Sequence, residues 1–148
     1  MPGWRVGMCA TNKTFISWIL KIKSNIDSGT FRGLQLAAAE AYNTNTPEWH
    51  HEANVETYRR RRNIAEKIMT ALGCTFDPSQ VGMFLWGKIP EKYADVEDLT
   101  ERVLNEARVF ITPGFIFGSN GKRYIRISLC AKDDKIQQAL TRIENIKW

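Results

Sequence analysis

Hydrophobic and polar positions alternate with a period of two residues near the end of the chain. Between Arg123 and Cys130, isoleucine and leucine residues alternate with polar ones, which predicts a half-buried strand. Arg126 falls in the middle of this strand, on the side opposite the core. A second strand is predicted over 109–112 and ends at Pro113-Gly114, a turn pair that lacks one N–H donor and permits positive φ.

Elsewhere apolar residues recur at helical spacing, and these stretches predict helices. The expected helices are one capped by Asn12, then 30–42, 54–72, 96–108 and 133–146, with a connector at 43–47. Shorter strands are expected at 4–9, where Trp4, Val6 and Met8 alternate with other residues, and at 74–76 and 82–87. Arg5 would lie on the face of the first strand opposite its apolar residues.

This order of elements predicts an α/β (α+β) fold. From about residue 54 onward we expect helices packed on one face of a small, largely antiparallel sheet. The first fifty residues fit this architecture less well. With 148 residues the chain is long enough for one domain with a substantial core.

The charge balance permits an acidic ligand without requiring nucleic acid. Lys and Arg number 21 against 16 Asp and Glu, a formal net charge of +5. Arg59 to Arg62 form the densest basic run. Four consecutive helical residues spread around the whole circumference, so they make no single basic face that could follow a phosphate backbone.

The cysteine and histidine patterns predict no metal site. Cys9, Cys74 and Cys130 form no CxxC pair, so we expect free thiols in a reducing cytoplasm. His50 and His51 are predicted to be surface residues of a connector, since the local sequence supplies no third zinc ligand. The chain also has no apolar run of membrane-spanning length and no signal-peptide pattern.

Arg126 is the strongest candidate for ligand binding. The planar fork of a guanidinium matches a carboxylate through two parallel hydrogen bonds. The alternative is an arginine on a solvated strand face that pairs with a neighbouring Asp or Glu. The alternation alone leaves both interpretations open.

Several separate stretches resemble successive landmarks of the class I/II aminotransferases. They are Pro2–Gly7 (PGWRVG), Lys23–Gly29 (KSNIDSG), Gly82–Trp86 (GMFLW), Pro113–Gly118 (PGFIFG) and Arg126–Ser128 (RIS). The combination is specific, whereas each piece alone is not. The resemblance covers the entire chain but only the C-terminal part of the family's protein, and it is strongest to the branch of diaminopimelate and aspartate-aminotransferase-like enzymes.

The resemblance implies a fold and a cofactor. Residues 54–148 would be the small C-terminal domain of a fold type I pyridoxal-phosphate-dependent transferase, and residues 1–53 the end of the large domain with its connecting helices. In that family pyridoxal 5'-phosphate is held by a Schiff-base lysine just upstream of the Gly-Trp-Arg motif. The chain starts after that position, so we expect it to contain no catalytic residue, bind no cofactor by itself and be inactive alone.

The resemblance also assigns roles to individual residues. Arg5 resembles the arginine that pairs with the cofactor phosphate, and Arg126 the arginine that clamps the substrate α-carboxylate. Ser24 and Asn25 resemble a loop presented to the neighbouring subunit's active site, although such a pair at a helix end is also ordinary capping chemistry. Phe84 would approach the pocket wall, or else be a core aromatic.

The partners that the resemblance implies are amino acid and 2-oxo acid substrates and a second copy of the chain, with a dimer expected. Neither nucleic acid nor a membrane is an expected partner. Two alternatives stay open at this point. One is a basic module that binds anions or nucleic acid through Arg59 to Arg62, Arg123 and Arg126, and the other is a domain that makes only protein contacts.

Overall fold

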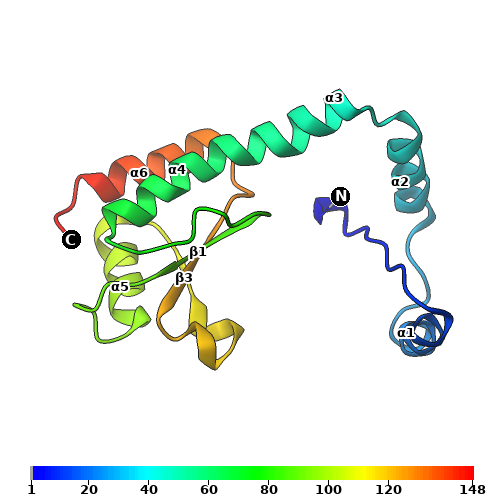
Figure 1. Ribbon diagram of the computed structural model, residues 1–148, viewed down its shortest axis with the longest axis horizontal. Helices are drawn as coiled ribbons and strands as arrows, with labels where there is room; N and C mark the ends of the chain where they lie inside the picture. The colour runs from blue at the N-terminus through cyan, green and yellow to red at the C-terminus, as the bar shows by residue number, and fades with distance from the viewer. Residues whose placement is uncertain (1) are drawn as a thin grey trace. The chain divides into compact units, whose positions relative to one another are not determined.

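The computed structural model describes residues 2–148 and divides the chain into two compact units (Figure 1). The units are Met1–His50 and His51–Trp148, and each is described by itself. The first contains the 3-10 turn η1 (Pro2–Trp4) and the helices α1 (Lys13–Ile26), α2 (Arg32–Thr44) and α3 (Pro47–His50). The second contains the sheet and the remaining helices.

Helix α1 begins where the sequence predicts. The side-chain oxygen of Asn12 accepts a hydrogen bond from the backbone N–H of Phe15 at 3.1 Å, which satisfies one of the unpaired donors of the first turn. The apolar stripe of α1 is exposed, and no residue of this helix is buried. Helix α2 follows close to the predicted range and buries Ala38.

The predicted strand at 4–9 is wrong. Pro2–Trp4 form a 3-10 turn, Arg5 follows in the left-handed region at φ 57°, and residues 6–12 have no regular structure. A strand is stable only when its N–H and C=O groups pair with a neighbour, and no strand of the described chain pairs with this stretch. The expected position of Arg5 on one face of a strand is therefore wrong as well.

The predicted connector around the histidines is also wrong, because the helix starts earlier than Asn54. Pro47, whose fixed φ suits the first helical position, opens α3, and the hydroxyl of Thr46 accepts from the N–H of Trp49 at 3.2 Å. The π-helical segment η2 (His51–Glu56) and helix α4 (Thr57–Ala71) follow directly. Both histidines are thus helical.

The sheet of the second unit has three antiparallel strands in the order β1-β3-β2. Its strands are β1 (Phe84–Lys88), β2 (Thr112–Pro113) and β3 (Tyr124–Ser128). The alternation predicts that β3 is a strand, and in the structure it is the central one. The expected strand over 109–112 shrinks to β2. The strand expected at 74–76 is reduced to a single bridge between Thr75 and Lys88.

One face of this sheet carries the hydrophobic core. Leu85, Ile125 and Ile127 point to it from the strands, while α4, α5 (Val96–Arg102), its π-helical continuation η3 (Val103–Ala107) and α6 (Asp133–Glu144) pack over it (Figure 1). Helices on one face of a small antiparallel sheet is the predicted architecture, and it is confirmed. The opposite face therefore remains available to other groups. None of the helices described is both long and apolar enough to span a lipid bilayer.

Candidate functional site

Arg126 lies on the face of the sheet that the helices leave open. It is the middle residue of β3 and stands opposite Trp86 of β1 and Thr112 of β2 in the strand register. Its strand neighbours Ile125 and Ile127 are buried in the core. Alternation across the central strand therefore places the guanidinium on the other side of the sheet, as predicted.

Aromatic rings surround the Arg126 guanidinium. Its Cζ atom is 3.8 Å from the ring centroid of Phe117, 4.1 Å from that of Phe84 and 5.9 Å from that of Trp86. Trp86 also meets Phe117 edge-to-face, with centroids 5.5 Å apart. Rings at these distances attract a cation through their quadrupoles. We call Phe84, Trp86 and Phe117 the aromatic cage.

A tightly folded glycine loop brings Phe117 to this position. The loop consists of the 3-10 turns η4 (Gly114–Phe117) and η5 (Ser119–Gly121). A Cβ atom added to Gly121 would lie 2.0 Å from the carbonyl oxygen of Gly114, so only glycine permits this contact. The loop thereby folds back on itself and places Phe117 over Arg126.

Arg126 forms no ion pair with any acidic residue that the structure describes. Its Nε atom is buried and has no hydrogen-bond partner among residues 2–148. The alternative in which Arg126 pairs with a neighbouring carboxylate is therefore not observed. A charged group with unsatisfied donors beside an open sheet face is suited to an anionic ligand.

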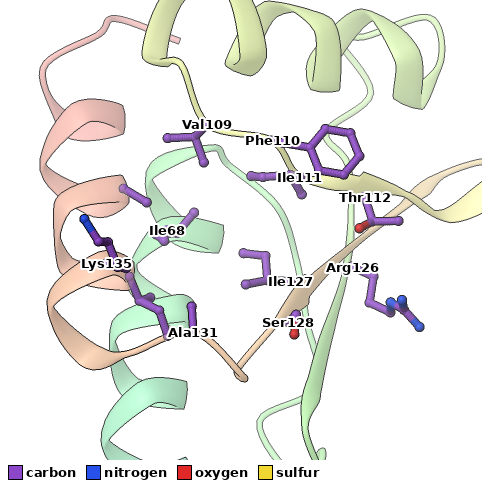
Figure 2. Close-up of a pocket in the computed structure, with 12 residues that line it drawn as sticks. Ile68, Val109, Phe110, Ile111, Thr112, Arg126, Ile127, Ser128, Ala131 and Lys135 are labelled. Atoms are coloured by element: carbon purple, nitrogen blue, oxygen red, sulfur yellow. The ribbon is translucent and has the colours of Figure 1, made fainter. Parts of the chain in front are cut away.

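An apolar cavity of about 290 Å³ adjoins the site on the core side. Ile68, Val109 and Ile127 line it, with Lys135 of α6 at its border. Figure 2 shows that the Arg126 side chain projects away from Ile68 and Ile127. Arg126 is also one of the residues that line this cavity, while the aromatic cage lies around its guanidinium.

The other arginines of the basic-module alternative mostly bind the chain itself. Arg61 donates through Nε to Asp133 at 2.8 Å and through Nη1 to the Leu129 carbonyl at 3.1 Å. Arg62 donates to the Gly82 carbonyl, and Arg123 donates to carbonyls of the 90–94 segment. These contacts join elements of the second unit, which is a structural role.

Asp133 is held ionised by this arrangement. The hydrogen bond from Arg61, reinforced by Arg60, keeps the pKa of the Asp133 carboxyl below its usual value of 3.8. Arg60 and Arg61 belong to α4 and Asp133 opens α6, so the ion pairs tie these two helices together. The basic run is thus partly neutralised where it meets α6.

The two other predicted site residues belong to the first unit. Arg5 is exposed and adopts a left-handed backbone conformation. The Asn25 side chain donates to the Lys21 carbonyl of its own helix at 2.6 Å, and Ser24 does the same at 3.1 Å. Both contacts are local side-chain-to-backbone bonds within α1, and the proposed role of Asn25 stays a prediction.

Histidine and cysteine residues add no further site. Among residues 2–148, His51 pairs through its Nε2 with the Glu56 carboxylate at 3.0 Å. Among the residues that the structure describes, no three potential ligands cluster as a metal ion would need. All three cysteines are free, as predicted, and burial raises the pKa of the Cys74 thiol to about 12.

Comparison with known proteins gives a consistent result over almost the whole chain. The profile of the family "Aminotransferase class I and II" matches residues 1–143. The chain belongs to this family. It is 37% identical over 147 residues to LL-diaminopimelate aminotransferase of Aquifex aeolicus, and 38% identical over 146 residues to glutamate-pyruvate aminotransferase AlaC of Escherichia coli.

These aminotransferases are much longer than the chain. The match covers 99% of the chain but 37% of the Aquifex protein, and 97% of the chain but 35% of the Escherichia protein. A solved aminotransferase of Staphylococcus aureus superposes with a TM-score of 0.78 at 31% identity, over 98% of the chain and 38% of that structure. The predicted family and fold, the C-terminal domain of a fold type I aminotransferase, are confirmed.

Pyridoxal 5'-phosphate is the cofactor of this aminotransferase family. Arg5 fits its phosphate chemically, because an exposed guanidinium binds phosphate oxygens through two parallel hydrogen bonds. The Arg126 donors, enclosed by aromatic rings, fit a planar carboxylate.

Of the aromatic cage, the sequence analysis names Phe84 as a candidate for the pocket wall but gives no role to Trp86 or Phe117. Trp86 and Phe84 are two residues apart on β1, so alternation alone places both on the face that carries Arg126. Alternation along the strand could therefore have identified Trp86 from the sequence. Phe117 lies in an irregular loop with no periodicity, and only the folded positions of Gly114 and Gly121 reveal its contact with Arg126.

Proposed function

We propose that this chain supplies the substrate-carboxylate side of the active site of a pyridoxal-phosphate-dependent aminotransferase, which moves an amino group between an amino acid and a 2-oxo acid. The observation that carries the proposal is Arg126. It lies in an aromatic cage with an unsatisfied Nε donor and no acidic partner in the described chain. Family membership supplies the reaction class.

In this proposal each arginine binds one anionic group. Arg126 holds the substrate α-carboxylate and thereby orients the α-carbon, which reduces the entropic cost of reaching the reactive geometry. Arg5 pairs with the phosphate of the cofactor. The bound cofactor supplies the electron sink, while the protein contributes binding and orientation. Asn25 is proposed to contact the substrate site of a neighbouring copy in a dimer.

The substrate-binding role of Arg126 can be tested in a chimera. In this chimera the chain replaces the aligned region of Escherichia coli AlaC, and glutamate and pyruvate serve as substrates. Arg126→Lys keeps the charge but loses the planar fork, so kcat/KM should fall at least about tenfold, which corresponds to roughly 1.4 kcal/mol.

The matched control is Arg142→Lys, an exposed position of α6 with only a 3.4 Å contact to a carbonyl. This variant should retain the kcat/KM of the unmodified chimera. Equal kcat/KM for Arg126→Lys and the unmodified chimera would assign Arg126 a structural role and contradict the proposal.

We also propose that the 148 residues alone do not transaminate. The reaction needs a positioned lysine nucleophile, and the family resemblance assigns that lysine to a position upstream of the Gly-Trp-Arg motif. The chain mixed with pyridoxal phosphate should show no conversion of glutamate and pyruvate, whereas AlaC should. Conversion that disappears when a single lysine of this chain is replaced would contradict this. We place the reaction in the cytoplasm, where free thiols such as those of this chain persist.

A further inference from the structure

The aromatic cage leaves only one edge of the Arg126 guanidinium accessible. The Phe84 and Phe117 ring centroids lie within 4.1 Å and 3.8 Å of Cζ, which is stacking distance for a flat cation. The Nε edge is buried, whereas the terminal Nη1 and Nη2 atoms are not. A ligand can therefore reach the guanidinium only through its terminal nitrogens.

We propose that Phe84 and Phe117 are positioning residues that hold Arg126 in one plane, so that a carboxylate is bound end-on by Nη1 and Nη2. This inference rests on the proposed function of Arg126 as the carboxylate ligand. Trp86 supports the arrangement from the strand, because it packs edge-to-face against Phe117. The cage replaces the acidic partner that orients many partly buried arginines.

The accessible edge of the Arg126 guanidinium limits the kind of ligand that can bind. A planar carboxylate offers two oxygens that match the two terminal nitrogens in one plane. The Phe84 and Phe117 rings lie close to the guanidinium carbon and restrict the access of a ligand to the faces of the guanidinium. The accessible edge is therefore suited to a carboxylate that approaches in the plane of the guanidinium.

Mobility of the Arg126 side chain tests the cage without any ligand. The 15N relaxation of the Arg126 Nε–Hε group in the 148-residue chain should give an order parameter close to the rigid value of about 0.85. Phe117→Leu removes one ring and should lower the order parameter toward about 0.6, whereas Phe117→Tyr keeps the ring and should preserve it. Phe115→Leu, in the same turn but without a recorded contact to Arg126, is the matched control.

Binding of sodium pyruvate to the same chain, followed through the backbone amide signals of β3 so that Arg126→Lys can be measured as well, tests the positioning role. Phe117→Leu and Phe84→Leu should each weaken binding about threefold or more, since each removes a contact worth a cation–π interaction. Phe115→Leu and Phe117→Tyr should bind as the unmodified chain does. Backbone spectra of every variant report whether it is folded.

The outcomes separate the two proposals. If Arg126→Lys abolishes pyruvate binding but both leucine variants bind normally, Arg126 remains the ligand and the positioning role is overturned. If the unmodified chain already shows a mobile Arg126 side chain, the cage proposal fails independently of any ligand. If pyruvate binding is the same in Arg126→Lys, the proposed function itself fails, and the positioning role fails with it.

Discussion

At the scale of single residues, the three thiols of the chain differ because only one is buried. Cys74 is 6% exposed in the core, whereas Cys9 and Cys130 are exposed to solvent. Burial in apolar surroundings disfavours the thiolate and raises the pKa of Cys74 to about 12. At neutral pH the Cys74 thiol is therefore protonated as well as inaccessible.

We expect two fast-reacting thiols and one protected thiol. At pH 8 iodoacetamide should modify Cys9 and Cys130 in the folded chain, while Cys74 should react only after denaturant is added. Peptide mass mapping after short exposure measures this directly. A Cys9→Ser/Cys130→Ser variant should be almost inert until it unfolds. Rapid modification of Cys74 in that variant would show that the core around it opens readily.

Arg126 illustrates which single-residue properties can be read from the sequence. Alternation with Ile125 and Ile127 was enough to place it on the open face of the sheet, because side chains of a strand alternate by geometry. Its partners were not accessible to the same reasoning. Phe117 contacts it through a loop whose path depends on close backbone contacts, and such contacts have no periodic signal.

At the scale of secondary-structure elements, the sequence predicts an element best where hydrogen bonds between near neighbours determine it. Asn12 begins α1 through a hydrogen bond within four residues, and this cap was predicted. The strand at 4–9 failed because a strand depends on a distant partner, which alternation cannot reveal. Thr46 followed by Pro47 is a local helix-start pattern that the sequence analysis does not use. The hydrogen bond from the N–H of Trp49 to the Thr46 hydroxyl explains why helix α3 starts before residue 54.

The glycine loop offers a test of how backbone packing positions a side chain. Gly121→Ala would place a Cβ atom 2.0 Å from the Gly114 carbonyl oxygen, so the loop must move. We expect Phe117 to leave Arg126 and carboxylate affinity to fall, while the core under Ile125 and Ile127 stays intact. Arg126 Nε–Hε relaxation and the backbone spectrum measure the two effects.

Gly82→Ala provides the comparison for this loop, since a Cβ atom there meets nothing within 4 Å although its φ of 89° also disfavours alanine. It tests backbone strain without the steric clash. Gly82→Ala should leave the Arg126 signal unchanged. An undisturbed Arg126 signal in Gly121→Ala would show that the loop does not position Phe117.

The ion pairs between α4 and α6 lead to a prediction about pH. Asp133→Asn should destabilise the chain by about 1 kcal/mol or less at pH 7, because the carboxylate is 40% exposed and solvent screens it. The folded pKa of Asp133 lies below the unfolded value, so its contribution is complete above about pH 5 and is lost as pH falls through the folded pKa.

Urea unfolding of the unmodified chain and Asp133→Asn at several pH values measures this difference. The two midpoints should differ at pH 7 and converge at acid pH below the folded pKa of Asp133, where this carboxyl is protonated in both states. Asp134→Asn, the neighbouring position without a recorded arginine partner, is the control. A gap that stays constant down to acid pH would exclude the ion pair as its source.

At the scale of the whole molecule, the exposed side chains of the first unit point to self-association. No residue of α1 is buried, although Phe15 and Trp18 lie on its apolar stripe and are 49% and 56% exposed. At roughly 25 cal/mol per Å², covering about 400 Å² of such surface contributes on the order of 10 kcal/mol before ordering costs. A second copy of the chain would provide a matching surface.

Sedimentation velocity at micromolar concentration should therefore report a dimer or larger species. Phe15→Asp combined with Trp18→Asp should return a monomer, because each carboxylate would have to be buried in the contact. Val81→Asp is the matched control, since Val81 is a highly exposed apolar residue of the second unit and should leave the association unchanged. A chain that is monomeric at all concentrations, with Trp18 fully accessible to a fluorescence quencher, would contradict this prediction. It would mean that α1 keeps its apolar stripe in water without a partner.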